Sequence, residues 1–270
     1  MAGFGVGWGN QPDLNFASYT TGDLFNQVAQ DGQSWGSVYS PDKTKMFVLG
    51  TANNAIYQYT ITDGDIKTAT YASLSLSVAA QTTSPRGLAI SSDGTKLYVA
   101  SSSNTTIYQY TLPTAYSLSG ASYSGLSFST SGQITNLIGL RFSADGTKLF
   151  ACNTNTSNSK IYQYTLSTAW AINTASYASL AFDVWAFSGT QVVSLDFSKS
   201  GMCLFFLSYE DATVYQMDLN APYSFSSVTP RNKYRLPDRT NSNVMSIVFS
   251  SDYQWMYTVA SAIQFQDKII

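Results

Sequence analysis

A six-residue phrase that returns about every fifty residues is the feature that most constrains the fold of this chain. Residues 107–112 read Ile-Tyr-Gln-Tyr-Thr-Leu, and related phrases begin at Ile56, Ile161 and, with more substitutions, Val214. The tyrosines at the second position of these phrases lie 51, 54 and 53 residues apart. A fixed period of this length indicates a repeat architecture, in which stacked units bury a continuous core.

The second repeat shows the complete unit. Two short apolar runs, Gly87–Ser91 and Lys96–Ala100, are separated by a turn at Ser92–Thr95, where aspartate can cap the turn and glycine supplies a positive φ. Thr106–Leu112 follows as an alternating segment rich in β-formers, and Ala121–Phe128 as a further strand. Four consecutive antiparallel strands of this kind form one blade of a β-propeller.

Counting the copies predicts five blades. An aromatic residue of the second strand recurs at Phe47, Tyr98, Phe150, Phe205 and Tyr257. The fifth copy stops after its third strand at 263–265, whereas Asp13–Tyr19 matches a fourth strand and stands before the first full copy. We therefore expect an all-β, five-bladed β-propeller of four-stranded antiparallel blades, closed by an N-terminal strand within Asn15–Tyr19 beside Ile263–Phe265.

The ends and the composition set further bounds. Residues 13–270 are expected to form this one propeller, and residues 1–12 a flexible arm whose Phe4 and Trp8 could dock onto a partner. The first ten residues contain neither a basic start nor an apolar stretch, so no secretory signal is predicted. Charged residues make up 11% of the chain and the net charge is −2, which argues against nucleic acid as a partner. No apolar run is long enough to insert into a membrane.

Residue types that carry common catalytic chemistry are scarce. The chain contains no histidine and a single glutamate, Glu210, which excludes Ser-His-Asp and Cys-His nucleophiles and histidine-ligated metals. We expect no catalytic residue, no metal and no cofactor. Cys152 and Cys203 are expected to be free, buried thiols. Four aspartates hold one repeat position and are interpreted as turn caps: Asp42, Asp93, Asp145 and Asp252.

The repeats resemble those of known bacterial and phage propellers. The core of the unit, Ser91–Val99, is similar to the repeats of lactonase-like and Tyr-Val-Thr-Asn propellers. The longer phrase Ile161–Trp170, and the Gly-Trp-Gly start at 7–9, resemble repeats and starts of tailed-phage structural proteins. The resemblance covers Asp13–Phe265. It implies a propeller fold and a place in a virion.

The predicted geometry gathers one set of loops on one face of the ring, namely those that join the second strand to the third and one blade to the next. Asparagine with aromatic residues suits sugar recognition, tryptophan and arginine are favoured anchors of protein interfaces, and asparagine is also an ordinary loop residue. The candidate binding residues are Trp35, Asn53, Asn54, Arg86, Asn104, Asn153, Asn155, Asn158, Trp185, Glu210 and Arg239.

Two further groups of polar residues fall inside the expected sheets. Arg141 and Asp196 hold one position of the innermost strand in neighbouring repeats, which predicts an ion pair between blades near the central channel. The repeated glutamines are interpreted as amides satisfied within the sheet rather than as a polar binding ring: Gln58, Gln109, Gln163 and Gln216.

Three functions follow as hypotheses. The first is a non-enzymatic structural or adhesion module of a virion, in a tail, fibre or capsid, that contacts other virion proteins or a host surface through the arm or a propeller face. The second is a lectin that binds glycans. The third, by analogy of fold alone, is an enzyme of the lactonase or hydrolase type.

Overall fold

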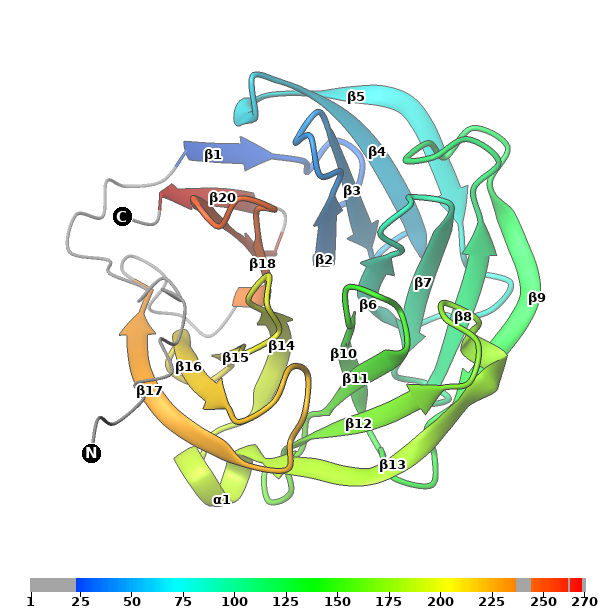
Figure 1. Cartoon of the computed structure of the whole chain (residues 1–270). Helices are drawn as coiled ribbons and strands as arrows, with labels where there is room; N and C mark the ends of the chain where they lie inside the picture. Colours follow the sequence, from blue (N-terminus) through cyan, green and yellow to red (C-terminus); the bar gives the residue numbers. More distant parts are fainter. Residues whose placement is uncertain (1–22, 237–243, 262, 269–270) are drawn as a thin grey trace, which may run out of the picture.

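The chain forms a ring of five antiparallel sheets. A computed structural model describes residues 23–236, 244–261 and 263–268. Within them lie five four-stranded sheets arranged around a central axis (Figure 1). The predicted five-bladed β-propeller is thereby confirmed.

The strands of blades 1 to 4 run from the channel outward in chain order, and blade 5 takes its outermost strand from the start of the chain. Blade 1 contains β2 (Ser34–Tyr39), β3 (Lys45–Gly50), β4 (Ala55–Thr62) and β5 (Asp65–Ser77). Blade 2 contains β6 (Pro85–Ile90), β7 (Lys96–Ser101), β8 (Thr106–Thr111) and β9 (Ser122–Ser129). Blade 3 contains β10 (Leu137–Phe142), β11 (Lys148–Asn153), β12 (Lys160–Leu166) and β13 (Ala175–Asp183). Blade 4 contains β14 (Val192–Phe197), β15 (Cys203–Ser208), β16 (Thr213–Leu219) and β17 (Val228–Arg235). Blade 5 contains β18 (Val244–Phe249), β19 (Trp255–Ala260), β20 (Ile263–Lys268) and, outermost, β1 (Asp23–Asn26).

The N-terminal strand closes the ring, as predicted, but with residues later in the chain. β1 pairs antiparallel with β20, with Asp23 opposite Gln266 and Phe25 opposite Gln264 (Figure 1). Gln58 of blade 1 holds the same position in its strand as Gln266 in β20. The residue opposite Gln58 is Leu74, which follows a bulge in the long outer strand β5. β1 therefore corresponds to the part of that strand after the bulge. The predicted segment Asn15–Tyr19 lies outside the described residues.

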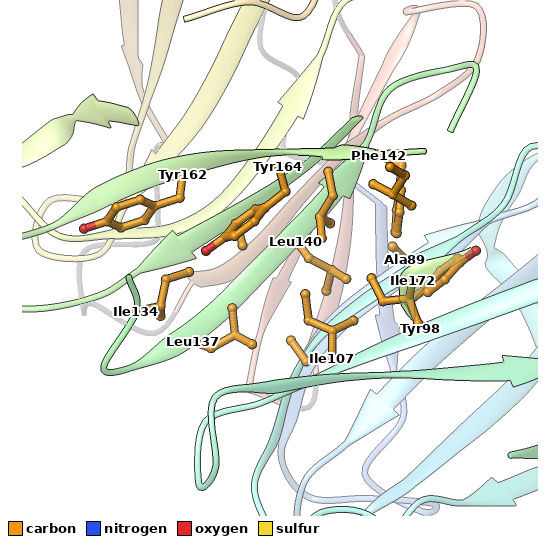
Figure 2. Close-up of a cluster of buried hydrophobic side chains, with 14 residues drawn as sticks. Ala89, Tyr98, Ile107, Ile134, Leu137, Leu140, Phe142, Tyr162, Tyr164 and Ile172 are labelled. Carbon is orange, nitrogen blue, oxygen red and sulfur yellow. The ribbon is translucent and has the colours of Figure 1, made fainter. Parts of the chain in front are cut away.

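Apolar side chains pack between neighbouring blades. Figure 2 shows the cluster between blades 2 and 3, where Tyr98 and Ile107 of one sheet meet Leu140 and Phe142 of the next. The inner strands β14, β15 and β18 are buried at every position, whereas the outer strands alternate between exposed and half-buried residues. This pattern is expected when sheets pack face to face and only their outermost strands meet water.

Glycine on the innermost strand allows neighbouring blades to approach closely. A Cβ at Gly87 would lie 2.6 Å from the carbonyl oxygen of Ile138 in the next blade, and one at Gly139 would lie 2.9 Å from the carbonyl oxygen of Val193. In blade 4 the same position is Ser194, whose hydroxyl accepts a 3.1 Å hydrogen bond from the backbone N–H of Ile247 in blade 5.

The repeated glutamines connect one blade to the next. The side-chain oxygen of Gln109 accepts a 3.0 Å hydrogen bond from the backbone N–H of Ile172, which lies in the next blade. The same bond joins Gln58 to Leu118 at 2.8 Å, Gln163 to Phe225 at 3.2 Å and Gln266 to Ile66 at 2.9 Å. These amides are buried and structural, which supports the interpretation against a binding ring. The predicted location of their hydrogen bonds was wrong, however, because each bond joins the glutamine to the next blade and not to its own sheet.

Two smaller findings complete the fold. Cys152 and Cys203 are free and buried, as predicted. In the described part of the chain, no helix has the length and apolar character needed to cross a membrane.

Candidate functional site

The two faces of the propeller carry different connections. We call the face with the turns between first and second strands, such as Ser91–Thr95, the turn face. The opposite face, with the loops between second and third strands such as Ser102–Thr105 and the connections between blades, is the loop face. A depression of about 280 Å³ lies at the turn-face end of the channel and one of about 160 Å³ at the loop-face end. A cavity of only about 20 Å³ lies between the inner strands.

The repeated aspartates of the turn face are turn caps, as interpreted from their position. The carboxylate of Asp93 accepts hydrogen bonds from the hydroxyl of Ser91 at 2.5 Å and from the backbone N–H of Thr95 at 3.0 Å. Hydrogen bonds from Ser40 and then from Thr44 lower the pKa of the equivalent Asp42. These carboxylates are therefore ionised at neutral pH and committed to their own turns.

Arg141 and Asp196 form the ion pair expected between blades. Arg141 Nε donates to Asp196 Oδ1 and Arg141 Nη2 donates to Asp196 Oδ2, both at 2.7 Å. Asp196 also accepts from the backbone N–H groups of Phe197 at 2.7 Å and Phe249 at 2.9 Å. One carboxylate thus joins blades 3, 4 and 5, and with four hydrogen bonds it is satisfied. The pair lies in the wall of the turn-face depression.

Aromatic rings surround the same depression. Tyr116, Trp170 and Tyr223 hold one position in three successive blades, each with a positive φ of 55°, 63° and 51°. This backbone conformation is uncommon for bulky residues and costs on the order of 1 kcal/mol at each. Each ring lies over the turn glycine of its own blade, so that a Cβ at Gly146 would fall 2.2 Å from the Trp170 ring. These aromatics were not predicted as site residues, although their spacing repeats.

The loop-face end of the channel brings together two of the predicted binding residues, Trp35 and Arg86. They hold the same position on the innermost strands of blades 1 and 2, where the other three blades carry Ile138, Val193 and Met245. The guanidinium carbon of Arg86 lies 3.9 Å from the centre of the Trp35 ring. A single cation therefore stands in a ring of otherwise uncharged residues.

Arg86 has no counter-ion in the described part of the chain. Its half-buried guanidinium makes the contact with Trp35 but no ion pair and no hydrogen bond with the described residues. Burial lowers the pKa of Arg86 from its usual value, but arginine remains protonated in proteins. A half-buried charge without partners is costly.

Other donors around the loop-face depression are already used. The side-chain amide of Asn136 donates to the carbonyl of Thr154 at 3.1 Å, and that of Gln191 donates to Glu210 at 2.8 Å. The hydroxyl of Tyr209, which also lines the depression, makes no hydrogen bond with the described residues. Arg86, Tyr209 and the indole N–H of Trp35 therefore supply side-chain donors that no described residue uses.

The remaining candidate residues do not converge on this depression. The side-chain amides of Asn53 and Asn104 donate to the hydroxyls of Tyr57 at 3.2 Å and Tyr108 at 2.7 Å, within their own blades. The buried Asn153 accepts from the backbone N–H of Asn136 and donates to the carbonyl of Asn158. Asn54 belongs to the loop between β3 and β4, Asn155 accepts from the backbone N–H of Ser157, and Trp185 lies in the short helix α1 (Val184–Ser188).

Two sets of predicted contact residues lie outside the described residues: Arg239 in one connection, and Phe4 and Trp8 in the arm. Tyr209, Asn136 and Gln191 were not predicted from the sequence. They belong to no motif, and only the folded ring brings them to the same depression. Among the described residues, no group of three potential metal ligands gathers in one place.

The closed ring of sheets places the chain in the class of five-bladed β-propellers. No protein-family model and no curated protein matches the chain. Among solved structures, it is similar to a functionally unknown protein from Desulfotomaculum acetoxidans, with a TM-score of 0.52 and 12% identity over 84% of this chain and 62% of that one. It is also similar to a Bacteroides uniformis protein whose description names a 6-phosphogluconolactonase, with a TM-score of 0.51 and 12% identity over 75% of this chain and 55% of that one.

A third similar structure is hydrazine synthase from Kuenenia stuttgartiensis, with a TM-score of 0.51 and 13% identity over 86% of this chain and 56% of that one. The chain thus spans between 55% and 62% of the length of these three proteins. At such low identity the likeness concerns the fold alone. The lactonase-like part of the predicted resemblance therefore has a distant structural neighbour, and the virion part stays a prediction.

Proposed function

We propose that this protein is a non-enzymatic interaction module whose loop face docks onto another macromolecule. The observation that carries the proposal is Arg86, a half-buried cation stacked on Trp35 at the loop-face mouth of the channel and unpaired within the described residues. A folded protein retains such a group at a cost, and a partner that supplies the missing acceptors removes that cost on binding.

The rest of the ring supports a rigid scaffold role. Asp196 is occupied by bonds between blades, and the aspartates of the turns are occupied by their own loops. A general acid or base needs a proton-transfer site within reach of a substrate, and these carboxylates are committed elsewhere. A rigid ring that presents loops is suited to binding a partner.

We further propose that the module belongs to a virion, as a component of a phage tail, fibre or capsid that contacts other virion proteins or a host surface. This placement rests on the likeness of the repeats and of the Gly-Trp-Gly start to those of tailed-phage proteins. The N-terminal segment with Phe4 and Trp8 is a second proposed contact.

The test is whether the chain occurs in particles. Particles purified from a lysate of the source culture are analysed by mass spectrometry and by immunogold electron microscopy with antibodies against the propeller. The expected result is labelling at a fixed place on intact particles and a constant ratio to the major capsid protein. A chain found only in the particle-free fraction would refute the placement.

The aromatic wall of the turn face favours a lectin as the second candidate function. Trp170, Tyr116 and Tyr223 line a depression of about 280 Å³ that also contains the Arg141 guanidinium. Aromatic faces beside a hydrogen-bond donor are a surface on which sugar rings can stack. A glycan array probed with the native protein and with Trp170→Ala tests this function. Hits that the substitution removes support a lectin, and an array without hits argues against it.

A further inference from the structure

Arg86 differs from the other described arginines of the chain. Arg141 is engaged by Asp196, and Arg231 pairs with Asp218 at 3.0 Å. Arg235 lies exposed on the outer strand β17, where water solvates its charge. Arg86 alone among these is half-buried in a concave site without a carboxylate.

The contact with Trp35 leaves the binding edge of Arg86 available. A guanidinium that stacks on an aromatic ring uses its flat face, whereas its N–H donors point outward in its own plane. No hydrogen bond with a described residue occupies these donors. Packing against Trp35 therefore holds a planar fork of donors in a fixed orientation, which is the geometry that a carboxylate accepts in a bidentate manner.

The size and the walls of the depression limit the occupant. Its volume of about 160 Å³ is small, and one broad face of Trp35 is covered by Arg86. Trp35 and Tyr209 also pack against the apolar cluster between blades 4 and 5. A sugar ring therefore finds little open aromatic surface to stack on, whereas one acidic side chain needs none.

The neighbouring negative charge does not occupy Arg86. Both carboxylate oxygens of Glu210 accept from Gln191, one from its backbone N–H and one from its side-chain amide, each at 2.8 Å. Glu210 is thus engaged by Gln191, and the positive charge of Arg86 remains available.

From these contacts we propose that the loop-face depression binds the carboxylate of an acidic side chain from a protein partner, with Arg86 as the bidentate donor and Tyr209 as a further donor. This assignment rests on the proposed use of the loop face for docking. It names the chemistry of the contact, which is a glutamate or aspartate side chain inserted at the mouth of the channel.

The test observes Arg86 directly. The chain has five arginines, so the Nε–Hε region of a ¹⁵N NMR spectrum of the intact protein contains at most five signals, and Arg86→Gln identifies the one that belongs to Arg86. The probe is N-acetylglutamate amide, its neutral control is N-acetylglutamine amide, and methyl glucuronide serves as the acidic sugar. The expected result is a saturable shift of the Arg86 signal with the glutamate probe. The dissociation constant of the glutamine probe should be higher by about tenfold or more.

The matched control is Arg235→Gln, which removes the same charge from the outer rim and should leave the Arg86 titration unchanged. An Arg86 signal that does not shift, or that shifts equally with the glutamine probe, would overturn the proposal. A uniform shift of all arginine signals would mean unspecific ionic contact and overturn it as well. Preference for the glucuronide would replace the protein partner with an acidic glycan.

The two proposals fail separately. A chain that is missing from particles removes the virion role and leaves carboxylate binding at Arg86 intact. A silent Arg86 signal in a chain that does occur in particles removes the acidic contact at the loop face and leaves the virion role standing.

Discussion

Replacing Asp196 by alanine should destabilise the propeller more than the loss of any exposed ion pair. The substitution removes two charge-assisted hydrogen bonds from Arg141 and leaves the backbone N–H groups of Phe197 and Phe249 without their acceptor. Breaking a buried pair by removing one partner costs about 3–5 kcal/mol. Because 24% of the Arg141 side chain is exposed, water can solvate part of the freed charge, and we expect the lower half of that range.

Arg141→Ala should cost less, about 2 kcal/mol, because Asp196 keeps the two backbone donors after the arginine is removed. The double variant should then be more stable than the sum of the two single changes predicts. We expect a coupling free energy of about 2 kcal/mol between the two residues, since they share one network.

Urea unfolding of the four proteins, followed by far-ultraviolet circular dichroism, measures this cycle. Lys160 and Asp183 provide the matched control pair: their charged groups are 3.1 Å apart, but the side chains are 31% and 42% exposed. Their coupling should be about 0–0.5 kcal/mol. The reasoning is refuted if the Arg141–Asp196 coupling is no larger than that of the control, or if Asp196→Ala leaves the unfolding free energy within about 1 kcal/mol of the native value.

Three further outcomes are expected. Burial alone would raise the pKa of Asp93, Asp145 and Asp252, but hydrogen bonds together outweigh it and hold the pKa of all four turn aspartates below the unfolded value of about 4, with that of Asp252 at about 2. Stability should therefore be constant above pH about 4 and fall between pH about 4 and 2. Urea unfolding across this range checks the prediction, and replacing all four aspartates by asparagine should flatten the loss. Gly87→Ala should lower the unfolding free energy by about 1–3 kcal/mol, measured by thermal or urea unfolding, because its Cβ would meet the carbonyl of Ile138. Gly32→Ala is the control and should be tolerated, because a Cβ there meets nothing within 4 Å. Burial raises the pKa of the Cys203 thiol to about 11 and also raises that of Cys152, so neither should react with a thiol reagent at pH 8 until the protein is unfolded; rapid reaction of the native protein would contradict the burial of both.

The repeat made the fold predictable because each copy carries its own complete set of local signals. Thr106–Leu112 and Ala121–Phe128 were predicted as strands and are observed as β8 and β9 within one residue at each end. The turn after the first strand and the aromatic residue of the second strand recur in all five copies, although the residues of the turn vary, so an ambiguous position in one copy can be read from the others.

Contacts between distant parts of the chain were harder to predict. Gln58 was interpreted as a residue satisfied within its sheet, yet its partner is the backbone of Leu118, 60 residues away. The fifth glutamine, Gln266, was missed because the pattern of its strand is degraded to Ile-Gln-Phe-Gln. Asp23–Asn26 was not predicted as part of the closing strand, because it is four residues long and contains aspartate and asparagine, which are depleted in strands; the predicted segment Asn15–Tyr19 lies outside the described residues.

The candidate site divides in the same way. The positions of Trp35 and Arg86 on the loop face could be predicted from their place in the repeat. That Arg86 lacks a counter-ion could not be, because the absence of a partner is a property of the whole folded surroundings. The group of aromatic rings around Trp170 also forms only in the folded ring, where the connections between third and fourth strands of several blades meet at the turn-face depression.

The brief closing strand makes the ring mechanically uneven. Within blade 5, a backbone ladder of only four residue pairs joins β1 from the first part of the chain to β20 from the last, whereas every other blade is one continuous piece of polypeptide. A partner that pulls on the amino-terminal segment would load this shortest ladder directly and could peel it from β20 before any other sheet yields. A partner seated on the loop face would instead spread its load over all the blades at once.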